Sequence, residues 1–335
     1  MKPIRMVLAC LLLLACFLTN CKQESRVAPK SSVPSEDLDK IARAGFSTYN
    51  VMDVDSGYIV EGDIFLRYDY LDVKPNSPLL QIAESEQYHT YALVTGTPRV
   101  ISISLAAGLP TVFTTAVDEA IARYNALGLK LSFQRVSSGG NINITTFYQA
   151  PYPDGSIVLG SSGFPSGGNP YNSITLNTHP QAYGSSPDML YLASVLQHEI
   201  GHCIGFRHTD YSNRNYSCNY SSSPNEGEAG VGAVHIPGTP TTGDPNSFML
   251  ACTSFGLNRS FNANDIIALQ SLYGSCDRVD QRYVNGVCET ATIELTNVTE
   301  APRGYVCSYS YVWSDGSEKP YKTLRTAQGC PSDPD

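Results

Sequence analysis

Residues 198–208 read HEIGHCIGFRH, and three of the chain's six histidines lie within this stretch. On an α-helix, His198 and His202 would be separated by about one turn, so both imidazole rings would project from the same face. Two imidazoles at this spacing can bind one tetrahedral zinc ion. The stretch therefore predicts a helix and a zinc site together.

Three further residues of the stretch complete the predicted site. Glu199 would lie about 100° around the helix from His198, so its carboxylate could reach a water on the metal without being a ligand. His208 could not reach the same metal on a continuous helix, because six further residues would carry it about 9 Å along the axis. Gly205 can adopt a left-handed conformation at little steric cost, which would let the chain turn and bring His208 back.

Hydrophobic periodicity in the rest of the chain predicts a mixed sheet with three main helices. The second helix is expected to begin at Ser186 as its capping residue, with Pro187 in the first position and Asp188 near the positive end of the helix dipole. Strands are expected around residues 101–105, 129–133, 142–144, 157–159 and 173–176, and helices over residues 110–127, 186–204 and 262–273.

The first residues have the composition of an export signal. Two basic residues precede an apolar run, residues 6–18, which is too short to span a bilayer but fits the apolar region of a signal peptide. Cys21 follows this run in a context that resembles a bacterial lipobox, whose Cys is acylated; Cys16 is the alternative lipidation site. The chain is therefore expected to be exported, either anchored to the membrane or cell surface as a lipoprotein or secreted.

The net charge of −9 argues against a nucleic-acid partner, because nucleic-acid-binding proteins carry basic surfaces. Seven cysteines follow Cys21, and this odd number predicts one free thiol in an oxidising compartment. Two bridges are expected within the Cys-spaced tail, residues 276–335. Among Cys203, Cys218 and Cys252, the sequence does not decide which two pair.

On these motifs the chain resembles the metzincin zinc endopeptidases, and most of all the bacterial dual-action HEIGH metallopeptidase family, whose name spells residues 198–202. The resemblance covers roughly residues 58–275. It implies that His198, His202 and His208 bind one catalytic zinc ion and that Glu199 is the catalytic base. It also implies a Met-turn beneath the metal at Met249, where the methionine packs as an apolar residue. Residues 261–274 resemble the closing helix of matrixin catalytic domains.

The chain departs from related families in how it could be kept latent. Ala251 stands two residues after Met249, where astacins and serralysins place a tyrosine that can reach the zinc. No cysteine lies between Cys21 and Cys203, so the cysteine switch of matrixins is not expected. Instead, the Gly-Asp pair that ends at Asp63 resembles the propeptide segment of astacins, in which the Asp carboxylate lies on the zinc. Asp63 is therefore a candidate latency ligand, and activating cleavage is expected between about residues 64 and 97.

The expected fold class is α+β, with a metzincin-like catalytic domain made of a mixed twisted sheet, an active-site helix and a C-terminal helix. An N-terminal pro-like segment and a small Cys-containing β module flank this domain. The expected divisions are a signal peptide (1–21), a tether and pro-like segment (22–96), the catalytic domain (97–275) and the C-terminal module (276–335).

The expected function is zinc-dependent hydrolysis of protein or peptide substrates by a monomer. Glu199 would take a proton from a zinc-bound water as this water attacks the scissile carbonyl. Residues 157–159 would bind the extended substrate by strand addition. The alternative is a non-enzymatic surface lipoprotein with a structural zinc site. Glu199 argues against this alternative, because a structural site closes with four protein ligands and has no use for an adjacent free carboxylate.

Overall fold

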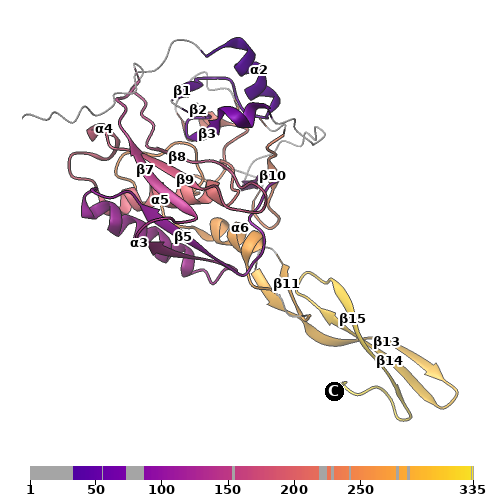
Figure 1. The fold of residues 1–335 in the computed structure, drawn as a ribbon. Helices are drawn as coiled ribbons and strands as arrows, with labels where there is room; N and C mark the ends of the chain where they lie inside the picture. The colour runs from indigo at the N-terminus through magenta and orange to yellow at the C-terminus, as the bar shows by residue number, and fades with distance from the viewer. Residues whose placement is uncertain are drawn as a thin grey trace, which may run out of the picture.

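The computed structural model describes residues 33–54, 56–72, 87–152, 155–218, 225–227, 230–240, 243–276, 279–284, 287–332 and 334. Figure 1 shows an N-terminal unit at one end of a central α+β domain and a C-terminal arm that projects from the other. The expected α+β fold class is confirmed. The predicted signal peptide, Cys16 and Cys21 lie outside the described residues. Within the described ranges, none of the helices has the length and apolarity needed to traverse a bilayer.

A five-stranded mixed sheet forms the base of the central domain, in the order β6-β5-β7-β9-β8. β8 runs antiparallel to β9, and the other neighbouring strands are parallel. The alternation predicted for the first strand holds, because Ile101 and Ile103 are fully buried and Ile101 lies opposite Phe133. The strands are β5 (Arg99–Leu105), β6 (Leu131–Val136), β7 (Ile142–Phe147), β8 (Gly160–Ser161) and β9 (Ser173–Asn177).

The strand predicted at residues 157–159 was wrong, because regular pairing begins only at Gly160. The carbonyls of Val158 and Leu159 accept hydrogen bonds from the side chain and the backbone of Asn177, each at 2.8 Å. An amide side chain thus takes the place of a ladder partner beside these residues. The apolar run packs against the core, which explains its strand-like composition.

The helices of the central domain are α3 (Thr111–Asn125), α4 (Pro180–Tyr183), α5 (Met189–Cys203) and α6 (Ala263–Tyr273). α3 and α5 lie against one another, and their apolar faces join the sheet in one core. The hydroxyl of Tyr124 on α3 donates to the carbonyl of Gln197 on α5 at 2.8 Å. This contact fixes α5 at the residue directly before His198.

The structure corrects the start of α5. The helix begins at Met189 rather than at Pro187, and its N-cap is Asp188, whose carboxylate accepts a hydrogen bond from the backbone N–H of Tyr191 at 2.8 Å. Ser186 and Pro187 lie in the preceding turn. An aspartate caps a helix as well as a serine does, so Asp188 can take the role that was expected for Ser186.

α6 closes the domain as predicted. Asn262 is its N-cap and forms a reciprocal capping box with Asp265. At the other end of the helix, the hydroxyl of Tyr273 donates to the carbonyl of Ile204, and it accepts the backbone N–H of Val94 at 3.2 Å. α6 therefore supports the turn that follows α5.

Between α5 and α6 the chain is mostly irregular. This region contains a 3-10 helix, η3 (Arg214–Tyr216), and the short strand β10 (Val234–His235), which pairs with β4 (Tyr88–His89). A disulfide joins Cys218 to Cys252, while Cys203 is free and fully buried. These observations settle the pairing that the sequence left open.

The residues before the main sheet belong to two parts of the structure, and those from Gln87 onward belong to the central domain. Gln87 donates to Ser247 at 3.0 Å and also to Asp265, and the backbone N–H of Thr90 donates to the carbonyl of Gly205 at 2.8 Å. Residues 87–94 are thus hydrogen-bonded into the central domain, although the sequence placed them with the pro-like segment.

The N-terminal unit, residues 33–72, has a small core of its own that includes Ile41, Val60 and Leu66. Val231 and Phe164 of the central domain complete this core. The unit therefore packs onto the central domain through apolar contacts. It comprises α2 (Ser35–Arg43), the antiparallel strands β1 (Met52–Val54), β2 (Gly57–Val60) and β3 (Ile64–Arg67), and the 3-10 helix η2 (Tyr68–Asp72).

The C-terminal module is an arm of antiparallel strands (Figure 1). As expected, it contains two disulfides, Cys276–Cys288 and Cys307–Cys330. Its strands are β11 (Gln281–Val284), β12 (Val287–Thr290), β13 (Thr292–Ala301), β14 (Gly304–Val312) and β15 (Glu318–Thr326).

Candidate metal centre

The last turns of α5 bring His198 and His202 together as the spacing predicts. Their Nε2 atoms are 3.0 Å apart. The helix then ends at Cys203, and the chain reverses at Gly205, whose φ is +110°. A side chain there would be strained and would also meet Leu93 and the carbonyl of Ala92.

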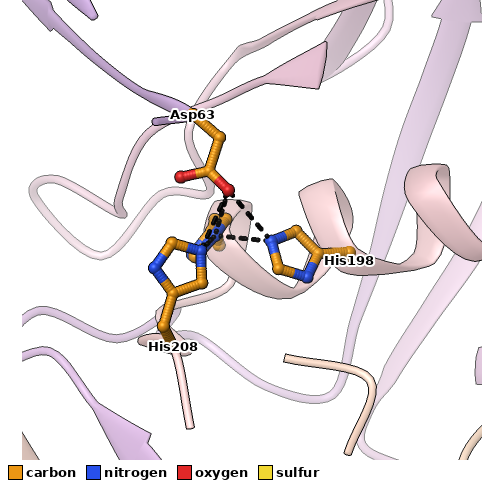
Figure 2. Close-up of side chains that lie close together, drawn as sticks. Asp63, His198 and His208 are labelled. Carbon is orange, nitrogen blue, oxygen red and sulfur yellow. Dashed lines mark hydrogen bonds and ion pairs between the residues drawn. The ribbon is translucent and has the colours of Figure 1, made fainter. Parts of the chain in front are cut away.

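The reversal returns His208 to the site. Its Nε2 lies 3.2 Å from that of His202, so the three ring nitrogens converge on one point. Figure 2 shows the rings of His198 and His208 directed toward this point. The structure therefore brings together the three histidines that the sequence singled out.

Each imidazole is oriented through its other nitrogen. His198 Nδ1 lies 2.9 Å from the carbonyl oxygen of Phe248, and His202 Nδ1 lies 2.8 Å from that of Phe206. A carbonyl can only accept, so both Nδ1 atoms carry the proton and both Nε2 atoms present lone pairs. Lone pairs of neighbouring Nε2 atoms repel one another unless a cation lies between them, so the donor set fits a zinc ion.

His208 is oriented by a carboxylate instead of a carbonyl. Its Nδ1 lies 2.5 Å from Glu226 Oε1, and Arg214 contacts the same carboxylate oxygen. Burial opposes a charge on His208, but Asp63 and Glu226 outweigh this effect and raise the pKa of His208 to about 10. The electrostatic environment of the centre thus favours a positive charge.

Asp63 reaches the cluster from the N-terminal unit (Figure 2). Its Oδ2 lies 2.9 Å from His208 Nε2, 3.3 Å from His198 Nε2 and 3.8 Å from His202 Nε2. Its Oδ1 is buried without a hydrogen-bond partner. The four ligand atoms all lie within 4.8 Å of one another, as four donors around a single ion would.

Glu199 is buried beside the cluster and is not among these four residues. Its Oε2 accepts a hydrogen bond of 2.6 Å from the hydroxyl of Ser162. Gly160 makes room for it, since a Cβ at that position would lie 2.9 Å from Glu199 Oε1. Burial and the charge of Asp63 raise the pKa of Glu199 well above its ordinary value.

Met249 lies beneath α5, fully buried in the main core. Gly201 allows this close approach, because a Cβ there would lie 2.6 Å from Met249 Sδ and 2.8 Å from a ring carbon of Phe248. The glycine within HEIGH is therefore needed for packing. The same close packing places the Phe248 carbonyl against His198.

No motif in the sequence indicated the buried ionic network behind the cluster. Arg207 Nη2 lies 3.0 Å from Glu226 Oε2 and 3.1 Å from Glu61 Oε2. Arg207 directly precedes His208 and Glu61 precedes the Gly-Asp pair, so proximity in sequence was the only signal for either. Glu226 had none, because it lies in an irregular segment without a recognisable pattern.

Three histidines that the sequence assigned no metal role lie outside the cluster. His89 Nδ1 contacts the Thr90 carbonyl, His179 caps α4, and His235 Nε2 contacts the Thr239 hydroxyl. These contacts are ordinary polar interactions.

Comparison with known proteins finds one matching family and several similar solved structures. The model of the dual-action HEIGH metallopeptidase family matches residues 60–273, more than half of the chain. Among solved structures, myroilysin is 18% identical with a TM-score of 0.37, over 56% of this chain and 98% of that one. High choriolytic enzyme 1, a hatching enzyme zinc-protease from Oryzias latipes (medaka fish), is 14% identical with a TM-score of 0.34, over 54% of this chain and 93% of that one. No curated protein matches the chain.

The contact between Glu226 and His208 predicts a measurable contribution to metal affinity. Glu226→Gln removes the negative charge that orients and polarises the imidazole, so zinc affinity should fall about 10- to 100-fold. Competition with a chromogenic chelator measures this affinity. Glu61→Gln is the matched control, because Glu61 contacts the same Arg207 but no imidazole. Equal zinc affinity in the wild-type and Glu226→Gln proteins would contradict the assigned role.

Proposed function

The chain belongs to the dual-action HEIGH metallopeptidase family and is a zinc metallo-endopeptidase, and we propose that it cleaves its protein or peptide substrates at the cluster of His198, His202 and His208, with Glu199 as general base. The observation that carries the proposal is the convergence of three imidazole Nε2 atoms beside a buried carboxylate that is not one of the ligands.

When bound, zinc acidifies a coordinated water and polarises the scissile carbonyl. Ser162 holds Glu199 Oε2, which leaves Oε1 free to accept a proton from the attacking water. Glu199 lines the cleft and can pass this proton to the leaving amine. The Met249 segment supports the reaction indirectly, by holding His198 through the Phe248 carbonyl.

We propose further that Asp63 keeps the full-length chain latent. Its carboxylate would supply a fourth ligand beside the three histidines, in the place that an attacking water needs. The backbone from Asp63 to Phe65 supports this placement, because the carbonyl of Asp63 accepts from the N–H of Ser162 at 3.0 Å and the N–H of Phe65 donates to the carbonyl of Ser162 at 2.6 Å. The inhibitory segment thus lies beside β8, at the edge of the sheet.

Activation then requires a cut between Asp63 and Gln87. Residues from Gln87 onward are hydrogen-bonded into the central domain and are expected to stay with it. The N-terminal unit has its own small core and can leave as a folded piece. Its release would uncover Val231 and Phe164 and would remove Glu61 from Arg207.

A structural zinc site in a surface-binding protein is the second candidate function. The observation that favours it is the fourth protein ligand, since structural zinc sites are closed by four protein side chains. The two candidates differ in one respect. A structural site gains no activity when Asp63 is removed, whereas a latent peptidase does.

We also propose export with a lipid anchor at Cys21. The three disulfides of the described residues support an oxidising compartment, and the anchor rests on the sequence around Cys21.

The general-base assignment predicts that Glu199→Gln loses activity but keeps its metal. Substitution removes proton transfer without removing a ligand, so kcat on peptides should fall by about 10²- to 10⁴-fold while zinc content stays near one ion per chain. Peptide-library digestion and metal analysis of the activated chain, cut between Asp63 and Gln87, measure the two quantities, and a chelator should abolish cleavage by the activated wild type. Glu119→Gln, on α3 away from the cleft, is the control. Substantial turnover by Glu199→Gln would remove Glu199 from its role.

The latency assignment predicts the opposite effect for Asp63→Ala. The uncleaved Asp63→Ala chain should hydrolyse peptides at least about tenfold faster than the uncleaved wild type, because the fourth zinc position becomes open to water. Asp69→Ala removes an exposed carboxylate of the same unit and should change nothing. Equal activity of wild-type and Asp63→Ala precursors would refute latency through Asp63.

The anchoring proposal predicts that Cys21→Ser moves the protein out of the membrane fraction. The acyl chain is attached through the Cys thiol, so the variant should be absent from the detergent phase when expressing cells are extracted and partitioned. Cys16→Ser is the control and should stay in the detergent phase. The reverse pattern would assign lipidation to Cys16.

A further inference from the structure

The cleft that contains the metal centre has a volume of about 950 Å³ and continues along α5 toward the N-terminus of that helix. Tyr191, Ser194, Val195 and His198 line it, and their spacing of three or four residues places them on one helix face. Residue 248 and residues 250–255 also line it. A substrate side chain next to the scissile bond can therefore extend from the metal centre into this part of the cleft.

Arg259 lines the same cleft and is fixed to α5 by its backbone. The backbone N–H of Arg259 donates to Ser194 Oγ at 2.8 Å. Ser194 precedes His198 by four residues, which is about 6 Å along the helix axis. Arg259 Nη1 lies 3.5 Å from the carbonyl of Cys252, another residue of the cleft lining. The backbone of Arg259 is thus held about one helical turn before His198, and its guanidinium is held at Cys252.

Within the described part of the chain, no ion pair joins Arg259 to a carboxylate; a backbone carbonyl is the acceptor of its guanidinium. Burial lowers the pKa of Arg259, so the charge is partly desolvated without a compensating ion pair. The acids whose charges act on it already accept other hydrogen bonds: Asp210 from Ser217 and Ala251, Asp244 from Asn262 and Asn264, and Asp265 from Phe248 and Asn262.

The charges along the cleft are distributed unevenly. The other arginine of its described lining, Arg214, contacts Glu226 behind the metal centre. The acidic residues of the described lining, Glu61, Asp63, Glu199 and Glu226, all lie at the metal end. Val195 and Leu250 add apolar side chains to the same lining. The cleft therefore combines acidic groups at the metal centre with apolar walls and a separate positive charge at Arg259.

We propose that Arg259 selects substrates with an Asp or Glu side chain adjacent to the scissile bond. The apolar walls would contact the methylene groups, and the guanidinium would pair with the carboxylate through two parallel hydrogen bonds. This inference rests on the proposed peptidase function and names the substrate class of the same site.

The test compares peptides that differ in one residue. The zinc-loaded, full-length Asp63→Ala chain is given fluorogenic peptides with Glu, Gln or Lys on either side of the scissile bond. At one of these two positions, kcat/KM for the Glu peptide should exceed that for the Gln peptide by about 10- to 100-fold. Arg259→Gln should remove this preference, and Arg259→Glu should favour the Lys peptide.

Two controls separate charge from structure. Arg135→Gln removes an exposed arginine outside the cleft and should leave the preference unchanged. Arg259→Lys keeps the charge and should keep a reduced preference for the Glu peptide. This variant keeps the test valid if Arg259→Gln fails to fold. Zinc content and melting temperature show which variants are folded. Equal kcat/KM for Glu and Gln peptides at both positions would overturn the inference while leaving the peptidase function intact.

Failure of the peptidase function itself gives a different result, because the zinc-loaded protein would then cleave no peptide of the series. Fluorescence anisotropy of the labelled peptides on the Asp63→Ala/Glu199→Gln chain then tests Arg259 without turnover. Tighter binding of the Glu peptide that disappears in Arg259→Gln supports the inference, and equal binding overturns it.

Discussion

The orientation of three imidazoles by three unrelated acceptors is the constraint on which the structure depends. The acceptors are the carbonyls of Phe248 and Phe206 and the carboxylate of Glu226. Each lies in a different segment: the one that contains Met249, the turn after α5 and the irregular region before α6. None of these segments is positioned by α5 alone, so the metal centre exists only when all of them are packed. This requirement explains why the irregular region is held by a disulfide and by paired short strands.

The parts of the site that have a fixed period in the sequence could be predicted. His198, Glu199 and His202 follow from helical spacing, His208 follows from the need for a turn at Gly205, and the structure places all four as the geometry requires. The N-terminus of α6 was equally predictable, because Asn262 and Asp265 are close in sequence and each side chain accepts a hydrogen bond from the backbone N–H of the other. Resemblance to a known family added Asp63, which no periodicity could have linked to a site more than a hundred residues away.

The parts that depend on tertiary contact could not be predicted. Ser162 and Glu226 reach the centre only through the path of the chain, and neither belongs to a spaced motif. At the start of α5 the N-cap is Asp188 and not Ser186, which the sequence favoured. The run at residues 157–159 had the composition of a strand, but at Val158 the side chain of Asn177 takes the place of a backbone donor. In each case, a long-range contact decided between local alternatives.

The buried thiol of Cys203 affects how the chain can oxidise. Cys203 follows the ligand residue His202 directly and is fully enclosed, and burial raises the pKa of its thiol well above the ordinary value. Exchange between thiols and disulfides requires a thiolate that can reach a disulfide sulfur. Once α5 is packed, the one unpaired cysteine among the described residues can neither ionise readily nor make that contact. The three native bridges are thereby protected from scrambling by the same packing that assembles the metal centre.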